Sequence, residues 1–360
     1  MTDTSLKRRF GLEPNEAAMM VQRAQGYRPN EAFCLLPTPS GLYPYRLPLS
    51  SVIADPSDEL VFHAGGDTGG VADPNPQLAV AAAMTADAGS SGATFFYHLG
   101  DVGYYNGRDS VYYPQFYEPY LHYPGPIFAI PGNHDGDNSD DTTVPSLTGF
   151  VTNFCQKQPM LTADAQDVNR DALDQPNVFW TLTANLATII GLYTNVPSGG
   201  QVDNDQAAWF QVELAAAPKE VPLIVALHHP PYSADAMHGG SARMGSLIDT
   251  ACAAAGRWPN LVLSGHVHDY QAFTRIDTAT RPKIKYLVAG ASGYHNLHAM
   301  APGIGALPWA VPGSDVTLDA YCDTAWGFLT LTITAKGIHG VYTTVDRTGK
   351  AKTFDTFDTP

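Results

Sequence analysis

The sequence has few basic residues and no long cluster of them. Its 360 residues contain 20 Lys and Arg against 35 Asp and Glu, a formal net charge of −15. The densest basic group is Lys7-Arg8-Arg9, so the electrostatic footprint of a nucleic-acid-binding protein is missing. An anionic substrate would have to be captured by local positive charge, which a bound metal ion supplies.

Cysteine pairs and long apolar runs are also missing. The four cysteines stand alone in the sequence, which excludes a CxxC zinc cage and a disulfide-rich scaffold. We expect them to be unpaired, and one disulfide is the alternative in an exported protein. No run of about 18 apolar residues predicts a membrane-spanning helix. The N-terminus has basic residues but no apolar stretch after them, so it is no signal peptide. This favours the cytoplasm, and a periplasmic or secreted location is the alternative if a signal was removed.

The sequence predicts one main domain with an N-terminal arm. Residues 1–58 show little periodicity and are expected to pack on a body formed by residues 59–360. In that body, short apolar runs alternate with predicted helices, which favours a layered α/β fold. The predicted helices are 76–88, 111–123, 204–217 and 240–255. Residues 136–176 and 296–325 are expected to be long loops at the rim, and 328–334 and 340–345 to be strands.

Five of the apolar runs end in polar segments whose side chains suit metal binding. These side chains are Asp67, Asp101, Asn133, His228, His266 and His268. Because loops at the carboxyl ends of strands in α/β sheets converge, we expect the six residues to meet. Carboxylate, amide and imidazole ligands suit transition metals of intermediate hardness. Two such metals clamp the oxygens of an in-line displacement, which favours phosphoryl transfer.

The ordered series GDTG, GDVGY, GNHD, VALH and GHVH resembles the five motifs of the purple acid phosphatases, within the calcineurin-like metallophosphoesterases. The resemblance covers roughly residues 60–270. It implies a four-layer α-β-β-α sandwich of two mixed sheets flanked by helices. It also implies two groups of metal ligands. Fe(III) would be held by Asp67, Asp101, Tyr104 and His268. A divalent metal (Fe, Zn or Mn) would be held by Asn133, His228 and His266, with Asp101 bridging.

Tyr104 carries the distinction between purple acid phosphatases and their relatives. Common metallophosphoesterases begin with Asp-x-His, whereas this sequence has Gly69 in place of that histidine. The resemblance implies that Tyr104 replaces the missing ligand as a phenolate, which favours Fe(III). The adjacent Tyr105 is the alternative ligand.

Two further histidines are candidate catalytic residues. By its resemblance to the family, His134 would face the phosphate, and a structural histidine is the alternative. His238 stands where plant members have the second of two adjacent histidines, and Met237 occupies the first position. Both histidines would help the leaving oxygen depart, and an exposed histidine without a role is the alternative for His238.

The remaining histidines have weaker signals. We expect His63, His98 and His229 to be structural and His295 to line the rim of the site. His298 receives no role from the sequence.

The resemblance implies an acid phosphatase. A hydroxide that bridges the metals or is bound to Fe(III) would hydrolyse small phosphate monoesters, with activity persisting at acidic pH. The first alternative is a phosphodiesterase for cyclic nucleotides or phospholipid head groups that uses the same core. The second is a non-catalytic metal-binding protein. Neither the natural substrate nor the oligomeric state follows from the sequence.

Overall fold

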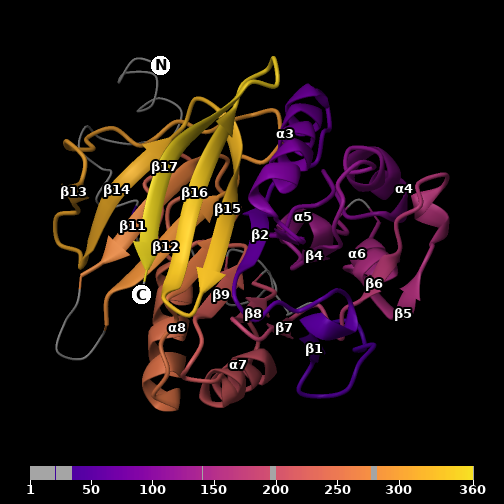
Figure 1. Ribbon diagram of the computed structural model, residues 1–360, viewed down its shortest axis with the longest axis horizontal. Helices are drawn as coiled ribbons and strands as arrows, with labels where there is room; N and C mark the ends of the chain where they lie inside the picture. Colours follow the sequence, from indigo (N-terminus) through magenta and orange to yellow (C-terminus); the bar gives the residue numbers. More distant parts are fainter. Residues whose placement is uncertain (1–20, 22–34, 140, 195–199, 277–281, 360) are drawn as a thin grey trace.

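A computed structural model describes residues 21, 35–139, 141–194, 200–276 and 282–359. Two large mixed sheets form the body, and helices lie on the outside (Figure 1). This arrangement confirms the predicted layered α/β fold. Among the described residues, no helix is long and apolar enough to span a membrane.

The larger sheet has nine strands in the order β1-β7-β8-β9-β10-β12-β11-β14-β13. Its neighbours β8, β9, β10 and β12 run parallel, and β11 and β14 continue the sheet in antiparallel fashion. The strands are Arg46–Pro48 (β1), Trp180–Thr183 (β7), Thr188–Leu192 (β8), Leu223–Leu227 (β9), Leu261–Ser264 (β10), Tyr270–Arg275 (β11), Ile284–Ala289 (β12), Trp309–Ala310 (β13) and Val316–Cys322 (β14).

The second sheet has six strands in the order β17-β16-β15-β2-β3-β4. Strands β2, β3 and β4 are parallel, and the C-terminal strands add an antiparallel half. The strands are Leu60–Gly65 (β2), Phe96–His98 (β3), Ile127–Ala129 (β4), Trp326–Thr334 (β15), Gly337–Val345 (β16) and Ala351–Thr359 (β17).

A layer of buried apolar side chains joins the two sheets. Phe62 of β2 stacks on Phe95 with ring centroids 4.7 Å apart, and Tyr97 of β3 stacks on Trp180 of β7 at 6.0 Å. Strands β2 and β9 are buried along their whole length. Strands covered on both faces need apolar residues at every position, which explains the continuous apolar runs in the sequence.

Three of the four predicted helices are confirmed. They are α3 (Asn75–Ser91), α7 (Asn204–Ala216) and α8 (Ala242–Ala255). Asp203 and Ser241 cap the last two by accepting a backbone N–H with their side chains. Helix α8 ends at Gly256, whose φ of 65° favours glycine.

The helix predicted over residues 111–123 is wrong in its extent. The chain forms a short helix, α4 (Asp109–Tyr112), and then a π-helical turn, η2 (Tyr113–Tyr117). Pro114 has no N–H to donate and its ring clashes with the preceding turn, so regular α-helix does not continue through it.

The two predicted rim loops contain regular structure. Residues 136–176 include α6 (Thr148–Phe154) and the pair β5 (Cys155–Met160) and β6 (Ala172–Asp174). Residues 296–325 include β13 and β14. In β14 the buried Val316 and Leu318 alternate with the half-buried Thr317 and Asp319, a short period that the surrounding Gly and Pro obscured.

Most of the predicted N-terminal arm lies outside the described residues. Its described part contributes β1, which pairs in parallel with β7 at the edge of the larger sheet. Arg46 of β1 forms an ion pair with the buried Glu213 of α7 at 2.8 Å. The boundary at residue 58 stays a prediction. Cys155, Cys252 and Cys322 are buried and free, and Cys34 lies outside the described residues.

Candidate metal centre

The carboxyl ends of five strands bring the predicted ligands together. Asp67, Asp101 and Asn133 follow β2, β3 and β4 of the smaller sheet within two to four residues, and His228 and His266 follow β9 and β10 of the larger one. Within each sheet these strands are parallel, so their ends lie at one edge. The packing of the two sheets then places both edges side by side.

The ligand-bearing turns have unusual backbone conformations. Asp67, Asp101 and His266 have φ values of 58°, 55° and 69°, in the left-handed region that non-glycine residues seldom adopt. A Cβ at Gly132 would collide with the carboxylate of Asp101, so this position requires glycine. The surrounding structure holds strained turns that aim the side chains inward, which is a common feature of functional sites.

Three of the predicted ligands meet at the Tyr104 hydroxyl. Its oxygen lies 3.2 Å from Oδ1 of Asp67 and 3.2 Å from Nε2 of His268. It also lies 3.3 Å from Oδ2 of Asp101. Tyr104 is 2% exposed, whereas the alternative ligand Tyr105 is 54% exposed. We call Asp67, Tyr104 and His268 the tyrosine cluster.

The other three ligands form a second group, the asparagine cluster. Oδ1 of Asn133 lies 2.9 Å from Nδ1 of His266 and 3.1 Å from Nε2 of His228. Nε2 of His228 is 3.3 Å from Oδ2 of Asp101. The same carboxylate oxygen of Asp101 therefore contacts both clusters.

The donor set fits transition-metal ions. Ligand atoms of Asp67, Asp101 and His228 lie within 4.8 Å of one another, close enough to share an ion. Phenol, carboxylate, amide and imidazole donors all face the same small region, and none is a thiol. The geometry therefore suits the two-metal arrangement that the resemblance implies.

Backbone groups orient the ligands. Nδ1 of His228 donates to the carbonyl of Leu99 at 2.9 Å, which directs Nε2 toward Asp101. Nδ1 of His268 donates in the same way to the carbonyl of Asn296 at 3.0 Å. The second oxygen of each carboxylate accepts a backbone N–H: His266 donates to Asp67, and His134 donates to Asp101, both at 2.8 Å.

Two of the predicted ligands, Tyr104 and His228, hold their protons more tightly than usual beside the carboxylates of Asp67 and Asp101. Burial and the neighbouring Asp67 and Asp101 raise the pKa of Tyr104 well above its usual value. Burial acts to lower the pKa of His228, but Asp101 and Asp67 outweigh it and raise this pKa to about 9. Metal ligands must give up such protons, so bound cations would replace them.

Two supporting residues tie the loops together. Asp135 of the GNHD motif accepts the backbone N–H groups of Val102, Gly103 and Gly132. Burial and then Asp101 raise its pKa to about 7. Gln115 of η2 forms two hydrogen bonds with the backbone of Tyr104. Its Oε1 accepts the Tyr104 N–H at 2.8 Å, and its Nε2 donates to the Tyr104 carbonyl at 2.7 Å. Asp135 was expected to orient its loop, whereas Gln115 has no signal in the sequence.

His134 lies beside the tyrosine cluster. Its ring centroid is 4.5 Å from that of Tyr104, and its Nδ1 donates to the carbonyl of Tyr105 at 2.7 Å. A carbonyl only accepts, so Nδ1 carries the proton and Nε2 remains the reactive nitrogen of the neutral ring. The side chain is partly exposed, as contact with a substrate requires.

His238 lies beside the asparagine cluster, and His298 lies next to it. The ring centroid of His238 is 4.8 Å from that of His266 and 5.0 Å from that of His298. His298 in turn stacks on His268 at 4.3 Å, and its Nδ1 is 3.0 Å from Oδ2 of Asp235. Burial and then His298 lower the pKa of His238 to about 4.

The predicted structural histidines are hydrogen-bonded in the interior. His63 lies between Tyr123 and Asp87, at 2.9 Å from each. Nδ1 of His229 is 2.9 Å from Oγ1 of Thr194, although its ring also lies 4.3 Å from that of His266. His295, expected at the rim of the site, packs on Tyr294 at 4.5 Å, and Tyr294 stacks on Tyr104 at 4.2 Å.

His98 limits the stability of the fold in acid. Burial lowers its pKa from 6.5 to about 3, so the unfolded chain binds a proton that the folded chain excludes between these values. The free energy of unfolding should therefore fall as the pH drops through that window, by up to about 1.4 kcal/mol per pH unit. His98→Gln should show a shallower fall, measured by urea denaturation from about pH 6 to 4. The exposed His339→Gln is the control, and equal slopes in all three proteins would contradict the prediction.

Comparison with known proteins identifies the family. A family model described as calcineurin-like phosphoesterase matches residues 62–270, more than half of the chain. No curated protein matches the chain.

Several solved structures are similar. Purple acid phosphatase PPD1 from yellow lupin (Lupinus luteus) seeds has a TM-score of 0.60 at 15% identity, over 84% of this chain and 54% of the lupin chain. GAP50, the anchor in the inner membrane complex of Plasmodium, has a TM-score of 0.55 at 17% identity, over 84% of this chain and 89% of the GAP50 chain. A dimetal phosphatase from Danio rerio has a TM-score of 0.51 at 10% identity, over 84% of this chain and 99% of the Danio rerio chain. At these identities the structures show the shared fold alone, whereas the family model covers all five motifs from β2 to β10. The chain belongs to the calcineurin-like phosphoesterase family.

Proposed function

We propose that this phosphoesterase hydrolyses phosphate monoesters at a dinuclear centre of Fe(III) and a divalent metal, of the purple acid phosphatase type. The observation that carries the proposal is the position of Asp101. One of its oxygens lies 3.3 Å from both the Tyr104 hydroxyl and the His228 imidazole, as a ligand shared by two ions must. The buried phenol in the first cluster favours Fe(III), a hard cation, over divalent ions.

The ligands divide as the two clusters do. Fe(III) would be held by Asp67, Asp101, Tyr104 and His268. A divalent ion (Fe, Zn or Mn) would be held by Asp101, Asn133, His228 and His266. When bound, these ions would neutralise charge on the phosphoryl oxygens and acidify the attacking water.

His134 and His238 flank the clusters from two sides. Nδ1 of His134 carries a proton and donates it in a hydrogen bond to the carbonyl of Tyr105. When the ring takes up a second proton, Nε2 becomes a donor to a phosphoryl or leaving-group oxygen. His238 is anchored through its backbone, because its N–H donates to Asp235 and its carbonyl accepts from Ser233. Each histidine can meet a different oxygen of a substrate bound between the clusters.

His298 is a positioning residue in this proposal. His298→Phe would keep the ring stacked on His268 and remove the bond to Asp235, which also anchors His238. We expect kcat/KM to fall about tenfold, because the carboxylate that anchors His238 loses a partner and small misplacements of a catalytic group cost rate. The control is His339→Phe, because His339 is exposed and pairs with Asp358. Equal kinetics for the two variants would remove His298 from the proposed machinery.

Assays of two synthetic esters test the activity. We expect the metal-loaded protein to hydrolyse p-nitrophenyl phosphate at least about tenfold faster, in kcat/KM, than bis(p-nitrophenyl) phosphate. Activity should persist below about pH 6, since Fe(III) is a strong acidifier of water. A preference for the diester would favour the phosphodiesterase alternative. Hydrolysis of neither ester at full metal occupancy would favour a non-catalytic metal-binding protein.

A further inference from the structure

A cavity lies at the other end of the strands that carry the candidate metal centre. Its volume is about 460 Å³, within the usual range for small-molecule sites. Its lining residues include Lys219 before β9 and residues 256–260 before β10. They also include Pro282 and Lys283 before β12 and Lys285 at the start of that strand. From Asn260 to His266 the chain advances six residues, or about 20 Å at the rise of an extended strand. The cavity is therefore separate from the metal centre.

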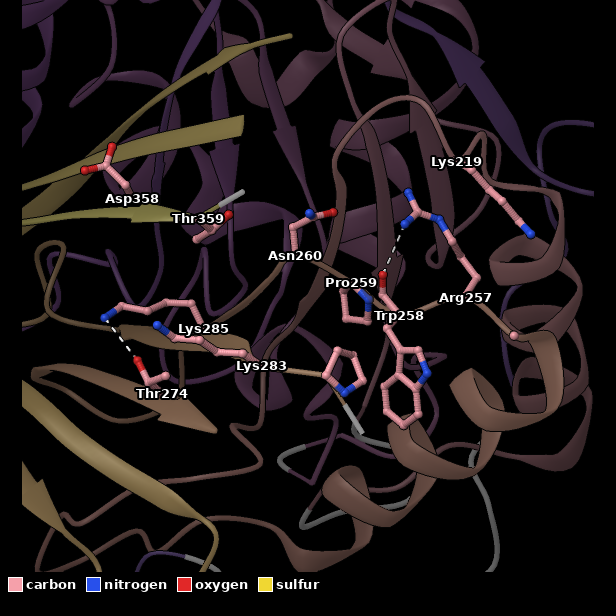
Figure 2. A pocket seen from close by; sticks show the side chains of 12 residues that line it. Lys219, Arg257, Trp258, Pro259, Asn260, Thr274, Lys283, Lys285, Asp358 and Thr359 are labelled. Atoms are coloured by element: carbon pink, nitrogen blue, oxygen red, sulfur yellow. Dashed lines mark hydrogen bonds between the residues drawn. The ribbon is translucent and has the colours of Figure 1, made fainter. Parts of the chain in front are cut away.

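Among the described residues, four basic side chains line the cavity, against one acidic side chain, although the chain as a whole is strongly acidic. Figure 2 shows two on each side of the cavity and apolar rings between them: Lys283 and Lys285 on one side, Lys219 and Arg257 on the other, and Pro259 and Trp258 in the middle. Asp358 is the one acidic residue in the described lining, and it pairs with His339 at 2.9 Å.

The four basic side chains differ in how far their charge is already neutralised. Lys285 is paired with Asp319 at 2.8 Å. Arg257 donates to the backbone carbonyls of Pro218, Val221 and Trp258. These bonds hold its guanidinium in the wall without a carboxylate partner, and its buried Nε has no hydrogen-bond partner among the described residues.

Lys219 and Lys283 are exposed and form no ion pair with any residue that the structure describes. Glu220, next to Lys219, is the acidic residue whose charge acts on Arg257. The cavity thus offers a fixed guanidinium and two free ammonium groups around a flat apolar middle.

We propose that this cavity binds a small organic anion that combines a flat ring with a phosphate or carboxylate group. The ring would pack beside Trp258 and Pro259, and the anionic group would meet Arg257 and Lys219, which lie on one side of these rings. Lys283 would add positive charge from the other side. Trp258 is half-buried, and the guanidinium of Arg275 lies 5.1 Å from its ring centroid, which fixes the indole in place. This proposal is independent of the proposed phosphatase activity.

Calorimetric titration with phenylphosphonate tests the site, because its C–P bond resists phosphoester hydrolysis. We expect binding at millimolar concentrations or below, and methylphosphonate should bind about threefold weaker for want of the ring. A parallel titration with benzoate distinguishes a site for carboxylates from a site for phosphate groups. In Lys219→Glu/Lys283→Glu the affinity for phenylphosphonate should fall at least about tenfold, because two attractive charges become repulsive.

The control is Lys352→Glu, which changes an exposed lysine at the opposite end of β17 from Thr359 and should leave binding intact. Phenylphosphonate bound at the metal centre would still bind to the double variant and would bind more weakly to Asp101→Asn. Phenylphosphonate bound in the cavity would show the opposite pattern. The proposal is overturned when neither phenylphosphonate nor benzoate binds at millimolar concentration. It is also overturned when the double variant binds the tighter of these two ligands as the unchanged protein does.

Discussion

Asp101→Asn is expected to lower phosphoester hydrolysis by on the order of 10³-fold or more, because a metal ion supplies several kcal/mol of charge stabilisation and each 1.36 kcal/mol is a factor of ten. Asparagine has nearly the same shape but is neutral. It therefore removes the negative charge that faces both Tyr104 and His228. Metal content should fall at both clusters, since Asp101 is the side chain that they share. The measurements are kcat/KM and elemental analysis of the purified variant.

Asp87→Asn is the matched control. Asp87 also pairs with a buried histidine, His63 at 2.9 Å, but it lies on α3 outside both clusters. It should cost some stability while kcat and metal content stay near those of the unchanged protein. Thermal unfolding of both variants without metal separates loss of the site from loss of the fold. Asp101→Asn with normal metal content and a rate within about threefold of the unchanged protein would defeat the proposed role.

The residues that form the candidate metal centre were predictable, because each stands in a regular relation to a strand. Asp101 and His228 each come within three residues of the end of a buried apolar run, and parallel strands bring such ends together. The structure places all seven predicted ligands in contact for this reason. Their identity as metal ligands remains a proposal.

Asp135 was predictable from its motif, but the supporting residues Gln115 and His298 were not, because only the fold brings them close. Gln115 and Tyr104 are eleven residues apart, yet their contact depends on the π-helical turn that Pro114 imposes. His298 reaches Asp235 across 63 residues, because the chain after β12 returns to the turn after β10, where the His298 N–H donates to the carbonyl of His268. Neither residue belongs to a motif, and neither has a periodicity that would mark it.

The basic cavity illustrates the same limit at the other end of the sheet. Lys219, Arg257 and Lys283 come from three separate connections, each an ordinary exposed or half-exposed basic residue in its own segment. The sequence has no basic run there, so its charge pattern indicated no anion site other than a metal centre. Parallel strands gather the residues that precede them as well as those that follow them, which makes both ends of this sheet places where distant side chains meet.

Tyr104→Phe is expected to abolish any visible tyrosinate-to-Fe(III) absorption and to lower iron content, while the fold stays intact. Only the hydroxyl is removed, so the ring can still stack on Tyr294 at 4.2 Å and lie against His134 at 4.5 Å. The hydroxyl is buried among Asp67 and Asp101, which raise its pKa, so a strongly charged cation must compensate its loss of a proton. Tyr105→Phe is the control, because that exposed ring lies outside both clusters and should leave the spectrum unchanged. A band that survives in Tyr104→Phe and vanishes in Tyr105→Phe would reverse the assignment. A protein that contains two divalent ions and no iron would place this chain among the other calcineurin-like phosphoesterases, with Tyr104 as a hydrogen-bond partner of Asp67 and His268.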